Sequence, residues 1–301
     1  MDAQSATADP RGRSAGARRH SANVRRAPLL LASVADAAEA VAALQAGAAV
    51  IDLKDPGAGP LGPCRPAVLR AAFLACRSLD PGRPMSVAAG PALSADATRI
   101  VAAAARFGST FVKVGLEGLA SPDESLKALR RVVAAAKRSR PDVRVIAATY
   151  ADAAGVAALP ASLLPEVAAR AGCDGCLLDT AVKDGRTLLD HARPSGLARF
   201  AADCRRRRLL CALAGSLRAD QLGALAAVGA DLIGARGALC EGGRGGRLVP
   251  ARVRAFAAAL EAAGSRRDRR SPAPGGVRGG APGKADPPRR AGPGAAPAST
   301  R

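Results

Sequence analysis

Three lysines and two aspartates lie within or just beyond apolar segments of this chain. They are Asp52, Lys54, Lys113, Asp179 and Lys183. The first two are two positions apart, so in a strand they project to the same side. A lysine held near other cations in a low-dielectric pocket has its charged form disfavoured, and the neutral amine can attack a carbonyl to form a Schiff base. Neighbouring carboxylates can move protons in later steps. These residues therefore predict lysine-dependent carbonyl chemistry.

These charges also have a structural interpretation. Each aspartate and the lysine that follows it could form an ion pair that ties loops together, and a single such pair would favour that role. Here, however, lysines have apolar neighbours in two segments, and Asp179 directly follows the apolar run 176–178. Charged groups are costly at the end of a buried strand, and in α/β folds that position is the catalytic rim. The combination favours catalysis.

Eight short apolar segments alternate with segments of helical periodicity. Such runs predict strands buried on both faces, as in a parallel sheet. We expect the strands at 29–34, 49–54, 85–89, 110–115, 143–149, 175–179, 209–214 and 231–235. The helices should follow, one ending near 47 and the others at about 66–78, 95–107, 123–138, 163–171, 187–207, 218–228 and 250–263. This alternation predicts an α/β protein with a single (β/α)8 barrel, and a doubly wound open sheet is the alternative.

Glycine-containing loops follow the seventh and eighth expected strands. Gly215 and Ser216 come after the seventh, and Gly234, Arg236 and Gly237 lie at the end of the eighth and just beyond it. In barrels these loops often bind phosphate, because glycine lets backbone N–H groups approach the anion. An arginine there could add a bidentate contact. The two loops together predict a phosphorylated small-molecule substrate.

The positive charge is concentrated at the two ends of the chain. The formal net charge is +20, of which residues 1–26 carry +4 and residues 264–301 carry +7. Both segments lack periodicity, so we expect a disordered basic arm at 1–26, a catalytic domain at 27–263 and a disordered Arg/Pro/Gly-rich tail at 264–301. Neither end has an aromatic residue to stack on bases, so no specific nucleic-acid partner is expected. A non-catalytic barrel that binds acidic partners through these tails remains an alternative of another class.

The cysteines indicate neither disulfides nor a metal site. There are seven of them, mostly inside apolar runs, which suits buried reduced thiols in a cytosolic protein. Cys173 and Cys176 have no partner pair and no histidine at zinc spacing.

No apolar stretch approaches the roughly 20 residues that span a bilayer, and the N-terminus lacks the apolar segment of a secretory signal. We therefore expect a soluble cytoplasmic protein without a metal.

Five segments of the chain, which occur in the same order as in the family, resemble the sequences of one protein family. They resemble the (5-formylfuran-3-yl)methyl phosphate synthase family, also called 4-(hydroxymethyl)-2-furancarboxaldehyde-phosphate synthase. The similarity covers about residues 28–260, and its most specific part is the stretch Asp-Thr-Ala-Val-Lys-Asp-Gly at 179–185. The loop at 242–247 and both tails depart from the family pattern. The matching segments are Ile51-Asp52-Leu53-Lys54-Asp55-Pro56, Val112-Lys113-Val114-Gly115-Leu116, Leu178 to Gly185, Cys211-Ala212-Leu213-Ala214-Gly215-Ser216 and Gly234-Ala235-Arg236-Gly237-Ala238.

This resemblance implies a TIM-barrel lyase of methanofuran-type cofactor biosynthesis that itself needs no cofactor. Such an enzyme condenses two molecules of glyceraldehyde 3-phosphate into a furan aldehyde phosphate, with loss of phosphate and water. The family's Schiff-base lysine falls on Lys54 and its neighbouring aspartate on Asp52. Further catalytic groups fall on Lys113, Asp179 and Lys183, so the resemblance selects the same five residues as their chemistry does. We also expect a homo-oligomer. Another Schiff-base aldolase acting on triose phosphates remains an alternative.

Overall fold

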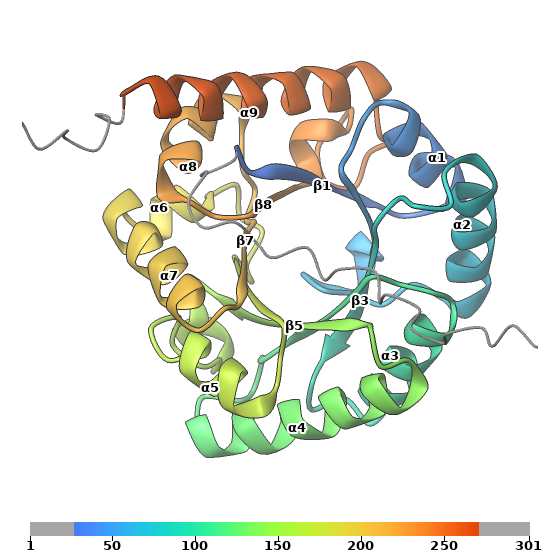
Figure 1. Ribbon diagram of the computed structural model, residues 1–301, viewed down its shortest axis with the longest axis vertical. Coiled ribbons are helices and arrows are strands. Elements are labelled where there is room, and N and C mark those ends of the chain that lie inside the picture. The colour runs from blue at the N-terminus through green and yellow to red at the C-terminus, as the bar shows by residue number, and fades with distance from the viewer. Residues whose placement is uncertain (1–26, 271–301) are drawn as a thin grey trace, which may run out of the picture.

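The computed structural model describes residues 27–270, which form a closed barrel of eight parallel strands (Figure 1). Each strand pairs with the next, and the first pairs with the last through Leu29↔Leu232 to Ala32↔Ala235. The helices form a ring outside the strands. Closure of the sheet confirms the predicted (β/α)8 TIM barrel and excludes the open doubly wound sheet.

The strands occur where the apolar runs predict them, with small shifts at their ends. They are β1 Leu29–Val34, β2 Val50–Leu53, β3 Met85–Pro91, β4 Phe111–Gly115, β5 Arg144–Tyr150, β6 Gly175–Asp179, β7 Leu210–Leu213 and β8 Leu232–Ala235. The α-helices are α1 Ala37–Gln45, α2 Pro66–Leu79, α3 Ala97–Arg106, α4 Pro122–Ser139, α5 Leu164–Ala171, α6 Leu188–His191, α7 Pro194–Arg206, α8 Leu222–Val228 and α9 Pro250–Arg270. Short 3₁₀ turns are η1 Pro56–Ala58, η2 Ala153–Val156, η3 Ala219–Gln221 and η4 Gly237–Leu239.

The strands divide their side chains between two separate apolar cores. One set packs outward against the helices, and the other fills the inside of the barrel with residues such as Leu31, Val50, Phe111 and Leu177. Successive residues of a strand point to opposite faces of the sheet. The side chain two positions after an inward-facing apolar residue therefore also faces the inside of the barrel. In several strands that next side chain is polar. The interior is therefore apolar below and charged at the carboxyl end of the strands.

Two helix predictions need correction. The region expected as one helix at 187–207 is divided into α6 and α7, because Pro194 has no N–H and holds Arg193 in an extended conformation. The last helix does not stop at 263 but continues to Arg270, so the expected tail begins inside α9. Gly264 allows close packing here, since a Cβ at this position would overlap with Ala27. Gly264 therefore serves the packing of α9 against the start of the described chain and does not end the helix.

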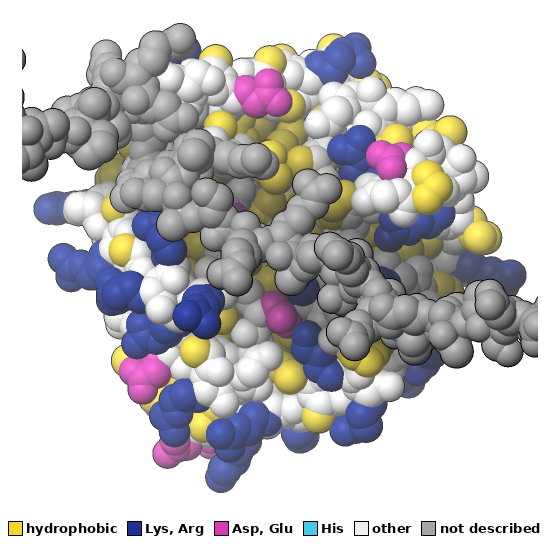
Figure 2. Space-filling model, viewed as in Figure 1, with side chains coloured by type: hydrophobic (Ala, Val, Ile, Leu, Met, Phe, Trp, Pro, Cys, Tyr) yellow, Lys and Arg dark blue, Asp and Glu magenta, His cyan; other side chains and the backbone are white. Residues whose placement is uncertain are grey.

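The expected disordered segments at 1–26 and, beyond α9, at 271–301 lie outside the described residues. All seven cysteines are unpaired and buried, as predicted. No helix between residues 27 and 270 is long and apolar enough to cross a bilayer. Lys and Arg side chains are spread around the periphery of the face shown in Figure 2, with fewer Asp and Glu among them. The excess of positive charge thus extends to the surface of the barrel.

Candidate active site

Asp52 and Lys113 form a buried ion pair inside the barrel. Lys113 Nζ lies 2.6 Å from Asp52 Oδ2, and the Ser33 hydroxyl donates to the same oxygen at 2.9 Å. Burial alone would raise the pKa of Asp52, but the cations Lys113 and Lys54 lower it below its ordinary value. Asp52 therefore does not form the ion pair with Lys54 that the structural interpretation expects. It pairs with Lys113 of β4, the second strand along from β2.

Asp179 and Lys183 form a second ion pair, on the β6 side of the site. Lys183 Nζ lies 3.0 Å from Asp179 Oδ1 and also donates to the carbonyl and hydroxyl oxygens of Thr180 at 2.6 and 3.0 Å. The Thr180 backbone N–H donates to the same carboxylate oxygen at 2.7 Å. Burial alone would raise the pKa of Asp179, but Lys183 and Lys54 lower it. The carboxylate is thus held ionised and in one orientation.

Lys54 is the lysine without a carboxylate of its own. It lies one residue beyond β2, is only 8% exposed, and its Nζ donates a long hydrogen bond of 3.5 Å to the Pro60 carbonyl. Within residues 27–270 it forms no ion pair. Burial, reinforced by the cations Lys113 and Lys183, lowers its pKa to about 8 against the opposing effect of Asp179 and Asp52. A substantial fraction of this amine is neutral near neutral pH, which a nucleophile requires.

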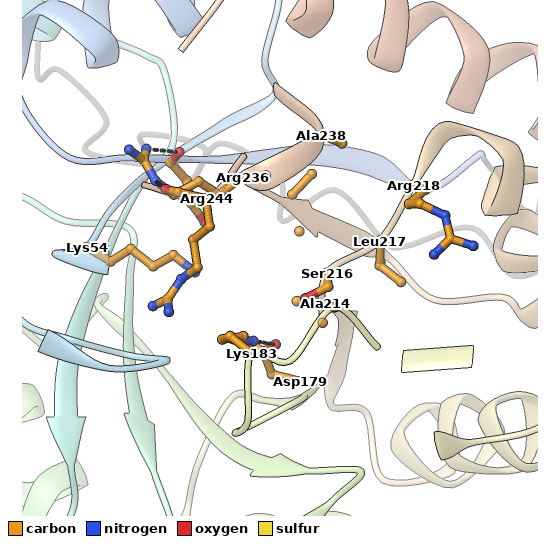
Figure 3. Close-up of a pocket in the computed structure, with 16 residues that line it drawn as sticks. Lys54, Asp179, Lys183, Ala214, Ser216, Leu217, Arg218, Arg236, Ala238 and Arg244 are labelled. Carbon is orange, nitrogen blue, oxygen red and sulfur yellow. Dashed lines mark hydrogen bonds and ion pairs between the residues drawn. The ribbon is translucent and has the colours of Figure 1, made fainter. Parts of the chain in front are cut away.

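A cavity of about 440 Å³ opens above these charges at the carboxyl end of the strands (Figure 3). Lys54, Asp179 and Lys183 line its floor. The loop after β7 lines its wall with Gly215 and Ser216, and Gly237 does so from the loop after β8, whereas Gly234, predicted as part of the second phosphate-binding loop, lines the cavity from within β8. Lys113 and Asp179 border a smaller hollow beneath it. The structure therefore brings together the five residues singled out by their chemistry and the predicted glycine loops.

The backbone of the loop after β7 has the conformation and the close contacts that require a glycine. Gly215 has φ +114° and Ser216 has φ +50°, both in the left-handed region. A Cβ at Gly215 would lie about 3.0 Å from the Thr180 methyl group and 3.1 Å from the Thr180 nitrogen. Glycine is thus required here both by φ and by the contact with the loop after β6. Through this contact the loop after β7 packs directly against the loop that carries the Asp179–Lys183 pair.

Arg236 does not have the free guanidinium that a phosphate contact requires. It is buried and pairs with Glu39 at 2.8 Å, and its remaining N–H groups donate to the backbone carbonyls of Ser33, Arg244 and Gly246. All five of its donors are engaged once its second contact with Glu39, at 3.5 Å, is counted. The bidentate phosphate contact predicted for Arg236 is therefore wrong for this structure.

The family model that describes 4-HFC-P synthase matches residues 30–257, from β1 into α9. The chain belongs to the 4-HFC-P synthase family. This confirms the resemblance seen in the segments around the five charged residues. As a member of a family of synthases, the chain is an enzyme.

Two related proteins illustrate how similar this chain is to other members of the 4-HFC-P synthase family. The (5-formylfuran-3-yl)methyl phosphate synthase of Methanococcus maripaludis strain C5 is 39% identical over 218 residues, which cover 71% of this chain and 91% of that protein. A relative from Streptomyces griseus is 40% identical over 216 residues, which cover 70% of this chain and 85% of the relative. The part of the chain that the family model matches, residues 30–257, contains the barrel strands and the candidate site.

Solved structures share the architecture of this family member at low sequence identity. The crystal structure of 3-hexulose-6-phosphate synthase superposes with a TM-score of 0.53 at 17% identity, covering 78% of this chain and 99% of that one. That of KGPDC from Streptococcus mutans gives a TM-score of 0.54 at 12% identity, covering 79% and 99%. At such identities the likeness shows the barrel fold alone.

Several polar residues of the site were not predicted from the sequence, among them Ser33 and Arg244. Ser33 donates to Asp52, and Arg244 lines the cavity from the loop between η4 and α9. Ser33 has a weak signal, since it is the one polar residue at the end of the first apolar run. Arg244 lies in a glycine-rich loop that matches no phosphate-binding motif, so only the folded loop reveals it. Within the described residues no cluster of His, Cys, Asp and Glu could hold a metal ion.

Proposed function

We propose that the enzyme condenses two molecules of glyceraldehyde 3-phosphate into (5-formylfuran-3-yl)methyl phosphate through a Schiff base on Lys54. The observation that carries this proposal is Lys54 itself, a buried amine with a lowered pKa, no carboxylate partner among the described residues, and a position on a cavity floor. Family membership supports the product, because the relative from Methanococcus maripaludis is named for it. The product would serve methanofuran biosynthesis.

The chemistry begins with the neutral Lys54 amine attacking the aldehyde carbonyl of one triose phosphate. The carbinolamine loses water to give an iminium, whose positive nitrogen acidifies the neighbouring C–H and so permits carbon–carbon bond formation with the second triose. Over the whole sequence, two triose phosphates give one furan aldehyde phosphate, one inorganic phosphate and two further molecules of water once the lysine is released by hydrolysis. No oxidant or reductant is needed, because these formulae balance.

The two ion pairs supply groups for the proton transfers and for phosphate departure. Asp179 lines both the cavity and the hollow beneath it, so it can take and return protons next to the Lys54 nitrogen. Lys183 faces the cavity with a positive charge that can stabilise a leaving phosphate. Asp52 and Lys113 lie deeper, where their charges influence the protonation of Lys54.

The decisive experiment is to incubate the purified protein with glyceraldehyde 3-phosphate and to identify the small molecules by mass spectrometry and ultraviolet absorbance. We expect a furan aldehyde phosphate from the wild type and none from Lys54→Ala, with unchanged circular dichroism and melting temperature. The matched control is Lys127→Ala, which removes an exposed lysine of α4 and should retain full activity. Reduction with borohydride should add the mass of one triose phosphate less one oxygen atom, to the wild type and to the control only, because the imine loses water and then gains two hydrogens.

Two results would contradict this proposal. A product without the furan absorbance, still dependent on Lys54, would indicate an ordinary Schiff-base aldolase. Unchanged triose phosphate, with no adduct trapped on folded protein, would exclude both reactions and indicate a different carbonyl substrate.

A further inference from the structure

Most basic side chains that line the cavity already have a carboxylate partner. Lys183, Arg218 and Arg236 pair with Asp179, Asp220 and Glu39, respectively. Two cations of the cavity, Lys54 and Arg244, form no ion pair within residues 27–270. Lys54 can shed its charge by losing a proton, whereas an arginine remains protonated. Among the described residues, Arg244 is thus the permanently charged cation of the cavity wall that has no ion-pair partner.

The Arg244 side chain is placed for a ligand inside the cavity. Figure 3 shows it pointing into the cavity, as Lys54 does, whereas Arg236 points away. One of its terminal nitrogens donates to the Gly59 carbonyl at 2.6 Å, in the loop after β2. Its Nε is buried and has no hydrogen-bond partner in the described part of the chain. An unsatisfied buried N–H is costly, and among the described residues the bond to Gly59 is the one hydrogen bond that this guanidinium donates.

The buried Glu39–Arg236 pair fixes the backbone that carries this side chain. Arg236 donates to the carbonyls of Arg244 and Gly246 at 2.7 and 3.1 Å, and Glu39 accepts the Leu248 N–H at 3.1 Å. The loop is closed further by the bridge between Cys240 and Leu248. Arg236 thus acts through Arg244, as a positioning residue.

Arg244 also lies against the predicted phosphate loop. Its backbone nitrogen is about 3.6 Å from the place where a Cβ of Gly237 would lie. Arg244 and Gly237 are therefore neighbours in the backbone, and both line the cavity, which the Arg244 guanidinium enters on the side of Lys54 (Figure 3). A phosphate group there would meet backbone N–H groups on one side and a planar cationic fork on the other.

We propose that Arg244 binds the phosphate group of the substrate, in the role that the sequence assigns to Arg236. The ligand class is a phosphate monoester, held by Nε and an adjacent terminal N–H in a bidentate contact. The identity of the substrate rests on the proposed function, but the binding of a phosphate group can be tested without turnover.

The test compares Arg244→Ala with Arg247→Ala, which removes an exposed arginine of the same loop. Calorimetry with inorganic phosphate as probe should give a Kd raised about 10- to 100-fold by Arg244→Ala and unchanged by Arg247→Ala. The KM for glyceraldehyde 3-phosphate should rise by a similar factor, with a smaller change in kcat. Arg244→Lys should recover part of the loss, because it keeps the charge but not the fork.

The failure of this proposal can be distinguished from failure of the proposed reaction. Borohydride trapping of glyceraldehyde, which carries no phosphate, should be equal in the wild type and Arg244→Ala. If Arg244→Ala changes neither the phosphate Kd nor the triose phosphate concentration needed for half-maximal trapping, the proposal for Arg244 is overturned while Lys54 keeps its role. If phosphate binding is lost with Arg244 but no aldehyde is ever trapped, the binding site stands and the proposed reaction fails.

Discussion

The pH dependence of Schiff-base formation is the most direct test of the electrostatics around Lys54. Its pKa is lowered to about 8 from 10.5, first by burial and then by the cations Lys113 and Lys183. At pH 7 this raises the neutral fraction of the amine from about one in 3,000 to about one in ten, a gain of about 300-fold. The corresponding difference in free energy is about 3 kcal/mol. The rate should therefore increase about tenfold per pH unit below pH 8 and level off above it.

The assay is the initial rate of cyanoborohydride trapping of glyceraldehyde, followed by intact-mass spectrometry between pH 6 and pH 10. An aldehyde without phosphate is used because a titrating phosphate would add its own pH dependence. Lys54→Ala provides the background from the remaining amines. Asp179→Asn should move the break in the profile below pH 8, because Asp179 raises the pKa of Lys54 in the wild type.

A profile that rises without a break to about pH 10.5 would refute this reasoning. Such a result would show that Lys54 behaves as an ordinary exposed lysine. A shift of the break to higher pH in Asp179→Asn would contradict the sign assigned to that carboxylate.

Three further changes test the surroundings of the site. Asp52→Asn leaves the buried ammonium of Lys113 unpaired, so urea unfolding should show a loss of about 3–5 kcal/mol; adding Lys113→Met should recover part of it, and no recovery would contradict the pairing. The buried carboxylates of the site have lowered pKa values, so their stabilisation is complete above the unfolded pKa near 4 and is lost as the pH falls below it. The melting temperature should accordingly drop below about pH 4, and a constant value down to pH 2 would argue against these shifts. Gly215→Ala forces a side chain into a left-handed contact and should cost about 1–3 kcal/mol and weaken phosphate binding, whereas Gly196→Ala, in open space on α7, should do neither.

The elements of the barrel could be predicted closely because their signal is local. A strand buried on both faces is an uninterrupted apolar run, so the segments 29–34 and 175–179 were predicted with their exact bounds. The prediction of a helix end was wrong where a glycine serves close packing instead of ending the helix. Gly264 has the composition of a helix end, but its contact with Ala27 decides that α9 continues past it.

The five charged residues of the site were likewise determined by the sequence, through their position at the ends of buried strands. Only the tertiary structure decided how they pair, since Asp52 of β2 meets Lys113 of β4, which is 61 positions away in the chain, inside the barrel. The same holds for the arginines of the last loop. Arg236 is bound to Glu39, which is 197 positions away, and this leaves Arg244 to face the cavity. Chemical type and strand position are properties of the chain, whereas the partner of each charge is fixed only when barrel closure brings distant segments within a few ångströms.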